Sequence, residues 1–388
     1  MVDKQILLLP GPTPVPPRVA LAMARPAINH RGPEFAELLY EVTAGLKEVF
    51  QTQNEVVILT ASGTGGMEAA VANLLSPGDK ALAVTIGAFG ERFIEIARRF
   101  EVDVEVMAFP YGQAADPEAV AARLAADKKK EIKAILVQHN ETSTGVLNDI
   151  QAISRARGEH PALLVVDTIS GLIAADLPVD AWGIDVAIAG SQKAFMLPPG
   201  LTMLSLNARA WEAVDRCTNR RYYLDLKLAR NSAAKGQTPH TPAVSLLFGL
   251  KEALQMVREE TLPGSFKRHT LLRDMVRAGI KALGLEPLAA DEVASPSVTA
   301  VKVPSGVKPS AITAPLREKH GVVVAGGQGQ VKDSIFRIGH LGHVSCNDIL
   351  AGLAALEEVL VELGWRTPDG AGVAAALKVY QEHQKGQK

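Results

Sequence analysis

The chain has 388 residues, of which 47% are hydrophobic and 21% charged, so it is long enough to bury a sizeable core and to divide into two domains. Its formal net charge of −1 provides no overall field that would attract nucleic acid or an acidic membrane, and small molecules are the expected partners. The two cysteines, Cys217 and Cys346, are far apart and form no C-x-x-C pair, which argues against a disulfide framework or a zinc site and fits a reducing cytoplasm.

The N-terminal sequence MVDKQILLLPGPTPVPPRV has one short apolar run before its prolines begin. This run is too short for the core of a signal peptide or for a membrane span. We therefore expect a cytoplasmic protein without a membrane partner. Because prolines favour extended backbone, residues 1–15 are expected to form an extended N-terminal arm, and the Pro-rich stretch 10–17 is expected to run over the surface of the protein.

Residues 16–260 alternate apolar runs with segments of helical periodicity, which is typical of a mostly parallel sheet joined by crossover helices. The stretches GGMEAAVANLL, ERFIEIARRF, DPEAVAARLAAD and NDIQAISRAR are the expected helices. This part of the chain is therefore predicted to be a large α/β domain. Its expected strands are residues 56–60, 81–86, 102–109, 134–139, 162–167, 184–189 and 201–206.

A smaller α+β domain is expected over residues 261–388. It begins with a long helical segment near residues 264–283, after which strand-like and helical patterns alternate. The expected strands are SVTAVKV, GVVVAG and IFRIGHLG, and the expected helices begin at PSAITAPLREKH and near residues 346–363.

The segment ASGTGG follows the strand expected at 56–60 and leads into a helix. Ligands of such sheets bind beyond the carboxyl ends of the strands. Glycines, a helix N-terminus and the hydroxyls of Ser62 and Thr64 suit a phosphate, although an ordinary glycine turn capped by Thr64 has the same sequence. It is not a Walker loop, because no Gly-Lys-Ser/Thr follows.

Two ionisable residues follow apolar strands. Asp167 ends the run ALLVVD, where it either caps the next turn or faces a basic heteroaromatic nitrogen. Lys193 follows IDVAIA through Gly-Ser-Gln, and by itself it resembles any solvated lysine. Together with a phosphate site, however, the two residues complete what pyridoxal 5'-phosphate requires: a lysine for the Schiff base, an acid opposite the pyridine nitrogen and an anion site.

Arg337 lies in the short β-type run IFRIG, where it points either outward or into a site. Its planar guanidinium can bind an α-carboxylate through two parallel hydrogen bonds. His30, Arg31 and His340 are further candidates for the mouth of the site, and structural roles fit them equally well.

Several motifs in fixed order resemble those of class V, fold type I aminotransferases of the alanine–glyoxylate, serine–glyoxylate and serine–pyruvate group. They are LLLPGPTPVPPRV, SGTGGMEAAVANLLSPGD, GAFGERF, HNETSTGVL, VVDTISGL, GSQKAFMLPPG, TPHTPAVSL and FRIGHLG, and they cover nearly the whole chain. The resemblance implies the PLP-dependent transferase fold type I, with a mostly parallel seven-stranded sheet in the large domain and a smaller C-terminal α+β domain.

The resemblance also implies roles for single residues. Lys193 becomes the Schiff-base lysine and proton carrier, Asp167 the partner of the pyridinium nitrogen, and Arg337 the residue that binds the substrate carboxylate. Thr241 and Thr238, the latter often tyrosine in relatives, correspond to phosphate contacts from a neighbouring subunit, which implies a homodimer with shared sites. The remaining implied cofactor contacts are Thr64, Gly65, Gly66 and Gln192 near the phosphate, Phe89 stacked on the ring where many relatives have tryptophan, Thr142 beside the ring and Ile169 below it.

The implied reaction is ping-pong transamination of a small amino acid, alanine or serine, with glyoxylate or pyruvate as acceptor. No matching motif places a second arginine for a side-chain carboxylate, so aspartate and glutamate are expected to be poor donors. A ureidoglycine or aminophosphonate donor remains open on the same fold, as does a cysteine desulfurase-like lyase. The lyase needs a mobile reactive cysteine, whereas Cys217 lies in a predicted helix and Cys346 at a helix start. A nucleotide-binding or non-enzymatic α/β protein is the more distant alternative.

Overall fold

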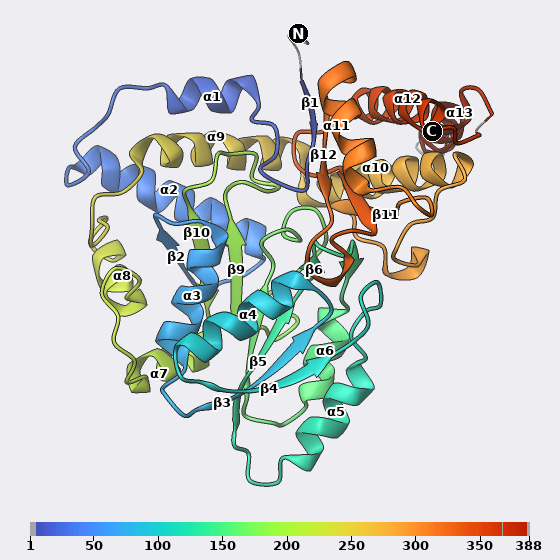
Figure 1. Ribbon diagram of the computed structural model, residues 1–388. Helices are drawn as coiled ribbons and strands as arrows, with labels where there is room; N and C mark the ends of the chain where they lie inside the picture. Colours follow the sequence, from blue (N-terminus) through green and yellow to red (C-terminus); the bar gives the residue numbers. More distant parts are fainter. Residues whose placement is uncertain (1–4, 367, 386–388) are drawn as a thin grey trace.

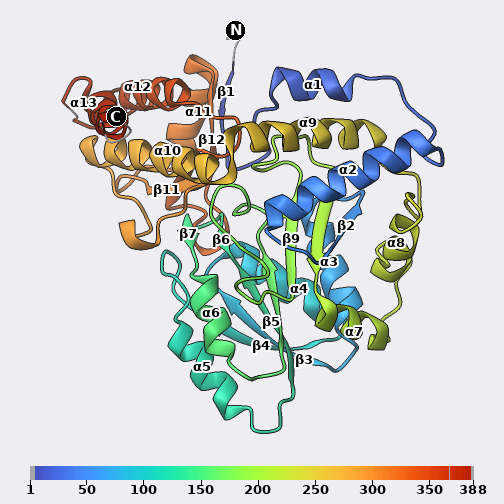
Figure 2. The ribbon, with the colours of Figure 1, turned by 180° about the vertical axis from the view of Figure 1, so that it is seen from behind.

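The computed structural model describes residues 5–366 and 368–385. A large sheet covered by helices occupies one part of the molecule, and a smaller sheet with its own helices lies beside it (Figures 1 and 2). The large sheet has the order β2-β10-β9-β8-β5-β3-β4, and β10 alone runs antiparallel to its neighbours. Its strands are β2 Glu55–Leu59, β3 Lys80–Thr85, β4 Asp103–Ala108, β5 Ile132–Gln138, β8 Leu163–Asp167, β9 Val186–Gly190 and β10 Thr202–Leu206.

These are the seven strands that the sequence predicts, and the mostly parallel seven-stranded sheet is confirmed. The central strands β8, β9 and β10 are buried along their whole length because helices cover both faces, which explains their continuous apolar sequences. The edge strand β4 instead exposes charged residues such as Asp103, which discourage pairing with another chain.

Two helical layers enclose the large sheet. One core packs α2, α5, α6 and α9 against one face, and a second packs α3, α4, α7 and α8 against the other. Side chains of Asp116, Asp149, Asn207 and Asp225 cap the N-termini of α5 to α8. The helices are α1 Pro17–Met23, α2 Pro33–Phe50, α3 Gly63–Leu74, α4 Ala88–Arg99, α5 Pro117–Ala126, α6 Ile150–Arg157, α7 Ala208–Arg216, α8 Leu226–Ala233 and α9 Val244–Glu260.

The smaller part has a four-stranded sheet in the order β1-β12-β13-β11. Phe336, Met275 and Leu356 belong to its separate apolar core. Its strands are β1 Ile6–Leu8, β11 Val298–Lys302, β12 Val322–Gly326 and β13 Ile335–Gly339. Its helices are α10 Leu262–Ala282, α11 Pro309–His320, α12 Cys346–Glu362 and α13 Ala371–Lys385, with 3-10 turns at Asp291–Val293 and Gly329–Val331; the short strands β6 Asn140–Glu141 and β7 Val146–Leu147 form a separate pair.

The N-terminal segment differs from the surface arm that the sequence predicts. β1 pairs in parallel with β12, and Leu8 and Pro10 are buried. The segment then packs against the large sheet, where the Thr13 hydroxyl donates to the Lys193 carbonyl oxygen at 2.9 Å. The segment is therefore partly buried and hydrogen-bonded to its neighbours on both sides instead of lying over the surface. Residues 1–4 of the predicted arm and 386–388 of the predicted small domain lie outside the described residues, and the boundary at residue 260 stays a prediction.

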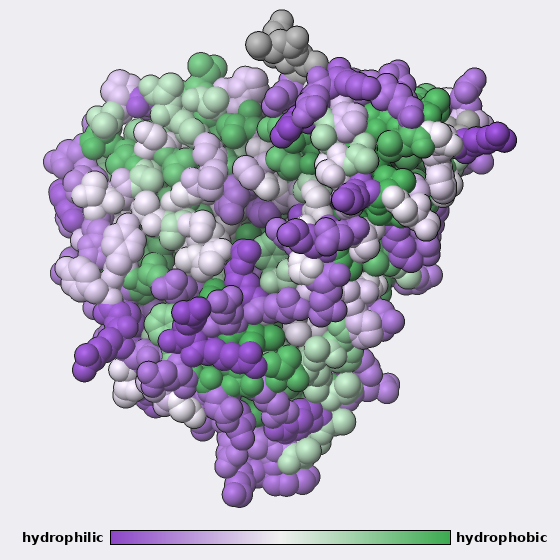
Figure 3. Space-filling model, viewed as in Figure 1, coloured by the Kyte–Doolittle hydropathy of each residue, from purple (hydrophilic) through white to green (hydrophobic). Residues whose placement is uncertain are grey.

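Polar and apolar side chains are mixed over the face of the molecule seen in Figure 3. None of the helices in the described part of the chain combines the length and the apolar character that a membrane crossing requires.

Candidate active site

Lys193 and Asp167 come together at the carboxyl end of the large sheet. Asp167 is the last residue of β8, and Lys193 follows the neighbouring strand β9 after Ser191 and Gln192. Both are buried, with Lys193 9% and Asp167 4% exposed. The Ser191 hydroxyl donates to the Pro198 carbonyl at 2.7 Å and fixes this turn, while Lys193 Nζ donates to the Pro10 carbonyl at 2.6 Å.

Burial shifts both of these groups toward their neutral forms. Loss of water raises the pKa of Asp167 to about 7; the Ile169 amide opposes this change and the Glu141 carboxylate adds to it. Loss of water also lowers the pKa of Lys193 to about 8, with a further contribution from the Arg337 guanidinium. A lysine with this pKa has a neutral, nucleophilic fraction near neutral pH, and a buried carboxylate is suited to pair with a basic ring nitrogen.

The start of α3 forms a cradle beside this pair. Ser62 at the N-cap makes no side-chain hydrogen bond to the helix, so the first amides are not capped by it. A Cβ on Gly66 would overlap the Thr202 hydroxyl and lie 2.8 Å from Ile188 Cγ2, so only glycine lets the helix approach the sheet. Gln192 Oε1 is buried without a hydrogen-bond partner among the described residues. Unpaired helix amides with a buried polar side chain nearby suit a phosphate group.

Ile169 and Phe89 provide apolar surface around this cradle. A Cβ on Gly63 would lie 2.7 Å from Ile169 Cδ1, which places Ile169 directly against the start of α3. Phe89 lies in the first turn of α4, and the guanidinium of Arg92 stacks on its ring at 4.7 Å from the centroid. Arg92 Nη1 in turn lies 3.3 Å from the Thr64 hydroxyl, which connects the aromatic ring to the cradle.

Glu141 fixes the position of Phe89, and the sequence analysis did not identify it. The amides of Phe89 and Gly90 each donate to Glu141 Oε2 at 3.1 Å, and the Ser143 hydroxyl donates to Oε1 at 2.6 Å. A Cβ on Gly87 would lie 2.5 Å from Glu141 Cγ, so the motifs GAFGERF and HNETSTGVL interlock. Burial raises the pKa of Glu141. The sequence feature that could have identified Glu141 is a carboxylate in a polar loop directly after a buried strand.

Arg337 comes from β13 of the small sheet and is 5% exposed. Its Nε donates to the Gly326 carbonyl at 2.8 Å and its Nη1 to the Thr142 carbonyl at 3.1 Å. The Thr142 hydroxyl shares a 2.6 Å hydrogen bond with the Ser170 hydroxyl. Burial lowers the pKa of Arg337 to about 10. Over residues 5–366 and 368–385 this buried cation has no ion-pair partner, which leaves it able to bind a carboxylate.

Thr238 and Thr241 are not joined to this cluster by any hydrogen bond in the described chain. The Thr238 hydroxyl donates to the His240 carbonyl at 2.7 Å, and Thr241 is exposed. Arg31 Nη1 donates to the Thr238 carbonyl at 2.6 Å, so Arg31 supports this loop. The loop approaches the end of β2, where the Ala243 amide donates to the Thr60 hydroxyl at 3.3 Å.

His340 has a structural environment. It is fully buried, with Nδ1 2.8 Å from the Pro296 carbonyl and Nε2 3.0 Å from the Thr299 hydroxyl. Burial lowers its pKa to about 3, so it remains neutral at physiological pH. Arg31 and His340, two of the three residues considered for the mouth of the site, are therefore hydrogen-bonded to groups outside the Lys193–Asp167 cluster.

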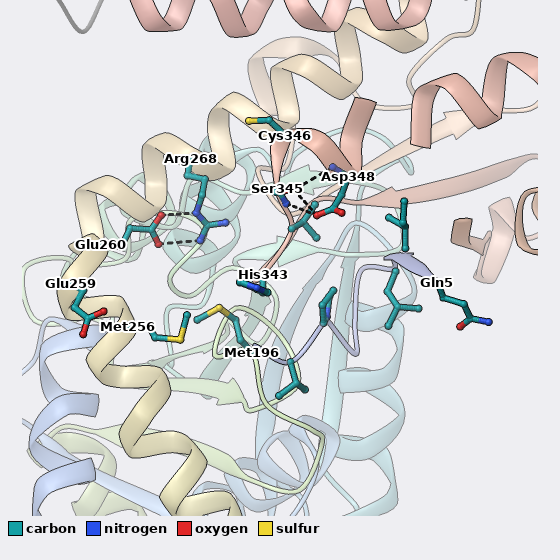
Figure 4. A pocket seen from close by; sticks show the side chains of 15 residues that line it. Gln5, Met196, Met256, Glu259, Glu260, Arg268, His343, Ser345, Cys346 and Asp348 are labelled. Carbon is teal, nitrogen blue, oxygen red and sulfur yellow. Dashed lines mark hydrogen bonds and ion pairs between the residues drawn. The ribbon is translucent and has the colours of Figure 1, made fainter. Parts of the chain in front are cut away.

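A large cavity of about 1000 Å³ lies elsewhere, between the N-terminal segment, the α9–α10 junction and the start of α12 (Figure 4). None of the site residues predicted from the sequence lines it. Two of its acidic groups are paired, Glu260 with Arg268 and Glu259 with Arg18. Cys346 lies on its wall, and the Cys217 thiol donates to the Leu75 carbonyl. Cys217 is the C-cap residue of α7 and Cys346 the first residue of α12, whereas a desulfurase-like reaction needs a cysteine on a mobile loop.

Residues 10–343 match the family model described as Aminotransferase class-V. The chain belongs to this family and is an aminotransferase. The predicted α/β architecture, with its second, smaller α+β part, is the one that the family's solved structures share.

Named relatives cover almost the whole chain. It is 47% identical, over 98% of its length and 99% of the relative's, to a protein of Synechococcus sp. (strain PCC 6716) named soluble hydrogenase, small subunit. It is 39% identical to L-aspartate–glyoxylate aminotransferase of Paracoccus denitrificans (strain Pd 1222), with 98% of both chains covered. It is 37% identical to serine–glyoxylate aminotransferase of Methylorubrum extorquens, with 97% of this chain and 96% of the relative covered.

Among solved structures, pyridoxamine-pyruvate aminotransferase from Mesorhizobium loti superposes with a TM-score of 0.94 at 32% identity. The match covers 98% of both chains. The described part of the chain, with its two sheets, therefore follows the architecture of a known aminotransferase.

Proposed function

We propose that this aminotransferase holds pyridoxal 5'-phosphate on Lys193 and transfers the amino group of serine or alanine to glyoxylate, with pyruvate as the second acceptor. The observation that carries the proposal is the position of Lys193, a buried lysine that follows β9 beside the buried Asp167 of the adjacent strand. The family is one of aminotransferases, and relatives named for glyoxylate and pyruvate support the choice of acceptors.

The residues around Lys193 fit the proposed cofactor. The uncapped start of α3 and the unpaired Gln192 oxygen are suited to its phosphate, which Thr64, Gly65 and Gly66 would contact. Asp167 would face its ring nitrogen, and Thr142 would lie beside the ring, with Phe89 and Ile169 on its two faces. When bound, the cofactor supplies an electron sink that stabilises the negative charge left when the Cα–H bond of an amino acid breaks.

Three residues of the chain would then transfer protons and orient the substrate. Once the substrate amine has displaced it, Lys193, with its pKa lowered by burial, would accept the proton from the substrate Cα and return it to the carbon that the lysine had held. Asp167 keeps a proton on the ring nitrogen by pairing with its positive charge. Arg337 binds the α-carboxylate of the donor and of the acceptor, which orients the Cα–H bond toward Lys193.

The proposal includes a homodimer in which Thr241, and also Thr238, reach the phosphate of the partner subunit, and a cytoplasmic location. Exposed aromatic rings next to this loop support an interface there. Tyr222 is 77% exposed, and the ring of Tyr223 stacks on His240 at 4.9 Å between centroids. Rings of this kind on a surface are typical of sites covered by another protein. Both cysteines are free, which is compatible with a reducing compartment.

A donor-by-acceptor activity panel on the purified protein tests the substrates. We expect serine–glyoxylate or alanine–glyoxylate turnover to exceed turnover of all pairs with aspartate, glutamate or 2-oxoglutarate. Arg337 can bind one carboxylate, and Arg31 is already hydrogen-bonded to the Thr238 carbonyl, so a second substrate carboxylate would lack a partner. Aspartate is the sharpest competitor, since one relative is named for it. Aspartate–glyoxylate turnover above that of both small donors would contradict the proposal.

A further inference from the structure

Arg92 is a cation in the candidate site to which the preceding sections assign no role, although it belongs to the motif GAFGERF. It lies on α4, one turn after Phe89, and its side chain returns over the Phe89 ring. Its Nη1 approaches the Thr64 hydroxyl to 3.3 Å. The guanidinium is therefore held at the point where the ring-stacking residue meets the cradle at the start of α3.

This guanidinium has no carboxylate partner within the residues that the structure describes. On the same helix, by contrast, Arg99 pairs with Glu95 at 3.3 Å. A charge that packs on an aromatic face and on a neutral hydroxyl keeps donor groups available for an anion.

The other residues on the phosphate side of the site carry no charge. Their hydroxyl, backbone and amide groups are neutral donors, and a helix N-terminus contributes only about half a positive charge. A phosphate monoester carries between one and two negative charges near neutral pH. Arg92 is placed to supply the missing positive charge. The neutral residues are Thr64, Gly65, Gly66, Gln192, Thr238 and Thr241.

We propose that Arg92 is a further cofactor-binding residue, whose guanidinium binds the phosphate from the side of Thr64 while it remains stacked on Phe89. This inference rests on the proposed function, because it requires the cofactor to occupy the cradle at α3. The same charge lies close enough to lower the pKa of both Lys193 and Asp167, which adds to the effect of burial on Lys193 and opposes it on Asp167. Arg92 thus connects the phosphate to the electrostatics of the reacting lysine.

The experiment compares two ligands that differ only in the phosphate. Cofactor-free wild type, Arg92→Gln and Arg92→Lys are titrated by calorimetry with pyridoxal 5'-phosphate and with pyridoxal. We expect Arg92→Gln to weaken pyridoxal 5'-phosphate binding by about ten- to a hundredfold, as for a lost charged hydrogen bond, with little change for pyridoxal. Arg92→Lys keeps the positive charge but lacks the planar guanidinium with its paired donors, so it should recover part of the lost affinity. Arg98→Gln, an exposed arginine of the same helix, is the matched control and should behave as wild type.

A second measurement uses inorganic phosphate alone. Millimolar phosphate should raise the melting temperature of the cofactor-free wild type and Arg98→Gln but not that of Arg92→Gln. Equal weakening of both pyridoxal compounds would overturn the inference, because Arg92 would then act only through the position of Phe89. Unchanged binding in Arg92→Gln would overturn it as well. If wild type bound neither compound, the proposed function itself would be wrong.

Discussion

Burial reduces the charge that the ionisable side chains Asp167 and Lys193 of the candidate site carry near neutral pH. Burial raises the pKa of Asp167 and lowers that of Lys193, so each is close to its titration midpoint near neutral pH. Arg337 keeps its charge, because its lowered pKa of about 10 is still above physiological pH. Besides the cations Arg337 and Arg92, the site thus contains two groups that can gain or lose a proton during a reaction.

The raised pKa of Asp167 predicts how the cofactor-free protein responds to pH. The unfolded carboxyl has a pKa near 3.8 and the folded one about 7, so the folded state holds the proton more tightly and loses stability as pH rises between these values. Asp167→Asn cannot titrate. We expect this variant to be more stable than wild type at pH 8, with the difference shrinking toward pH 4.

Urea unfolding of both cofactor-free proteins across this range measures the difference. Asp127→Asn serves as a comparison: because the Ile132 amide lowers the pKa of Asp127, this variant should be less stable than wild type by an amount that stays nearly constant above pH 4. A stability difference for Asp167→Asn that stays constant with pH would mean that Asp167 is already ionised in the folded protein.

The lowered pKa of Lys193 predicts the pH dependence of cofactor capture. Only the neutral amine attacks a carbonyl, so the rate at which cofactor-free protein gains the visible absorbance of bound pyridoxal 5'-phosphate should rise with pH and level off above about 8. Stopped-flow absorbance gives this profile. A rate still climbing at pH 10, as for a free lysine, would show that burial does not tune this amine.

At the scale of helices and strands, local pattern predicted every strand of the large sheet and the helices α3 to α6 and α10 to α12. The local pattern did not predict the N-terminal strand. Ile6 pairs with Val322, and this long-range pairing cannot be inferred from the residues around Ile6. Glu141 and Arg92 were missed for the same reason. Their importance comes from contacts with Phe89 and Thr64, which only the folded arrangement of α3, α4 and the loop after β5 brings together.

The packing of α3 on the sheet gives a prediction for Gly66→Ala. Alanine favours helix over glycine by about 1 kcal/mol, so without a clash this variant would gain stability. Because its Cβ would overlap the Thr202 hydroxyl, we expect instead a loss of about 1–3 kcal/mol and weaker cofactor binding as α3 moves off the sheet.

Urea unfolding and a pyridoxal 5'-phosphate titration measure the two effects. Glu68→Ala, on the exposed face of the same helix, should change neither. A Gly66→Ala protein that is as stable as wild type and binds the cofactor equally well would show that the close approach of α3 to β10 is not needed.

At the scale of the whole molecule, the candidate site draws on parts that are distant in sequence. Lys193 and Asp167 belong to the large sheet, Arg337 to the small sheet, and the Pro10 carbonyl to the N-terminal segment that joins the small sheet through β1. The proposed dimer would add Thr241 of the partner subunit. Sequence motifs identified most of these residues, but their assembly depends on how the two sheets pack.

Hybrid dimers test whether the sites are shared. One subunit carries Lys193→Ala and the other Thr241→Ala. If Thr241 reaches across the interface, the subunit that keeps Lys193 receives an intact Thr241 and binds the cofactor as tightly as wild type. If Thr241 acts within its own subunit, this site shows the weaker affinity of the Thr241→Ala homodimer. A catalytically competent monomer in sedimentation would contradict the dimer itself.

The most direct test of the account is to find where the cofactor is attached. The protein loaded with pyridoxal 5'-phosphate is reduced with borohydride, digested and sequenced by mass spectrometry, with Lys193→Ala as the control. We predict one phosphopyridoxyl label, on Lys193 in the peptide that contains GSQKAF, and no label in a folded Lys193→Ala protein, whose transamination should fall by several orders of magnitude. A label on another lysine, or near-normal turnover of Lys193→Ala, would contradict the assignment of Lys193 as the residue that holds the cofactor.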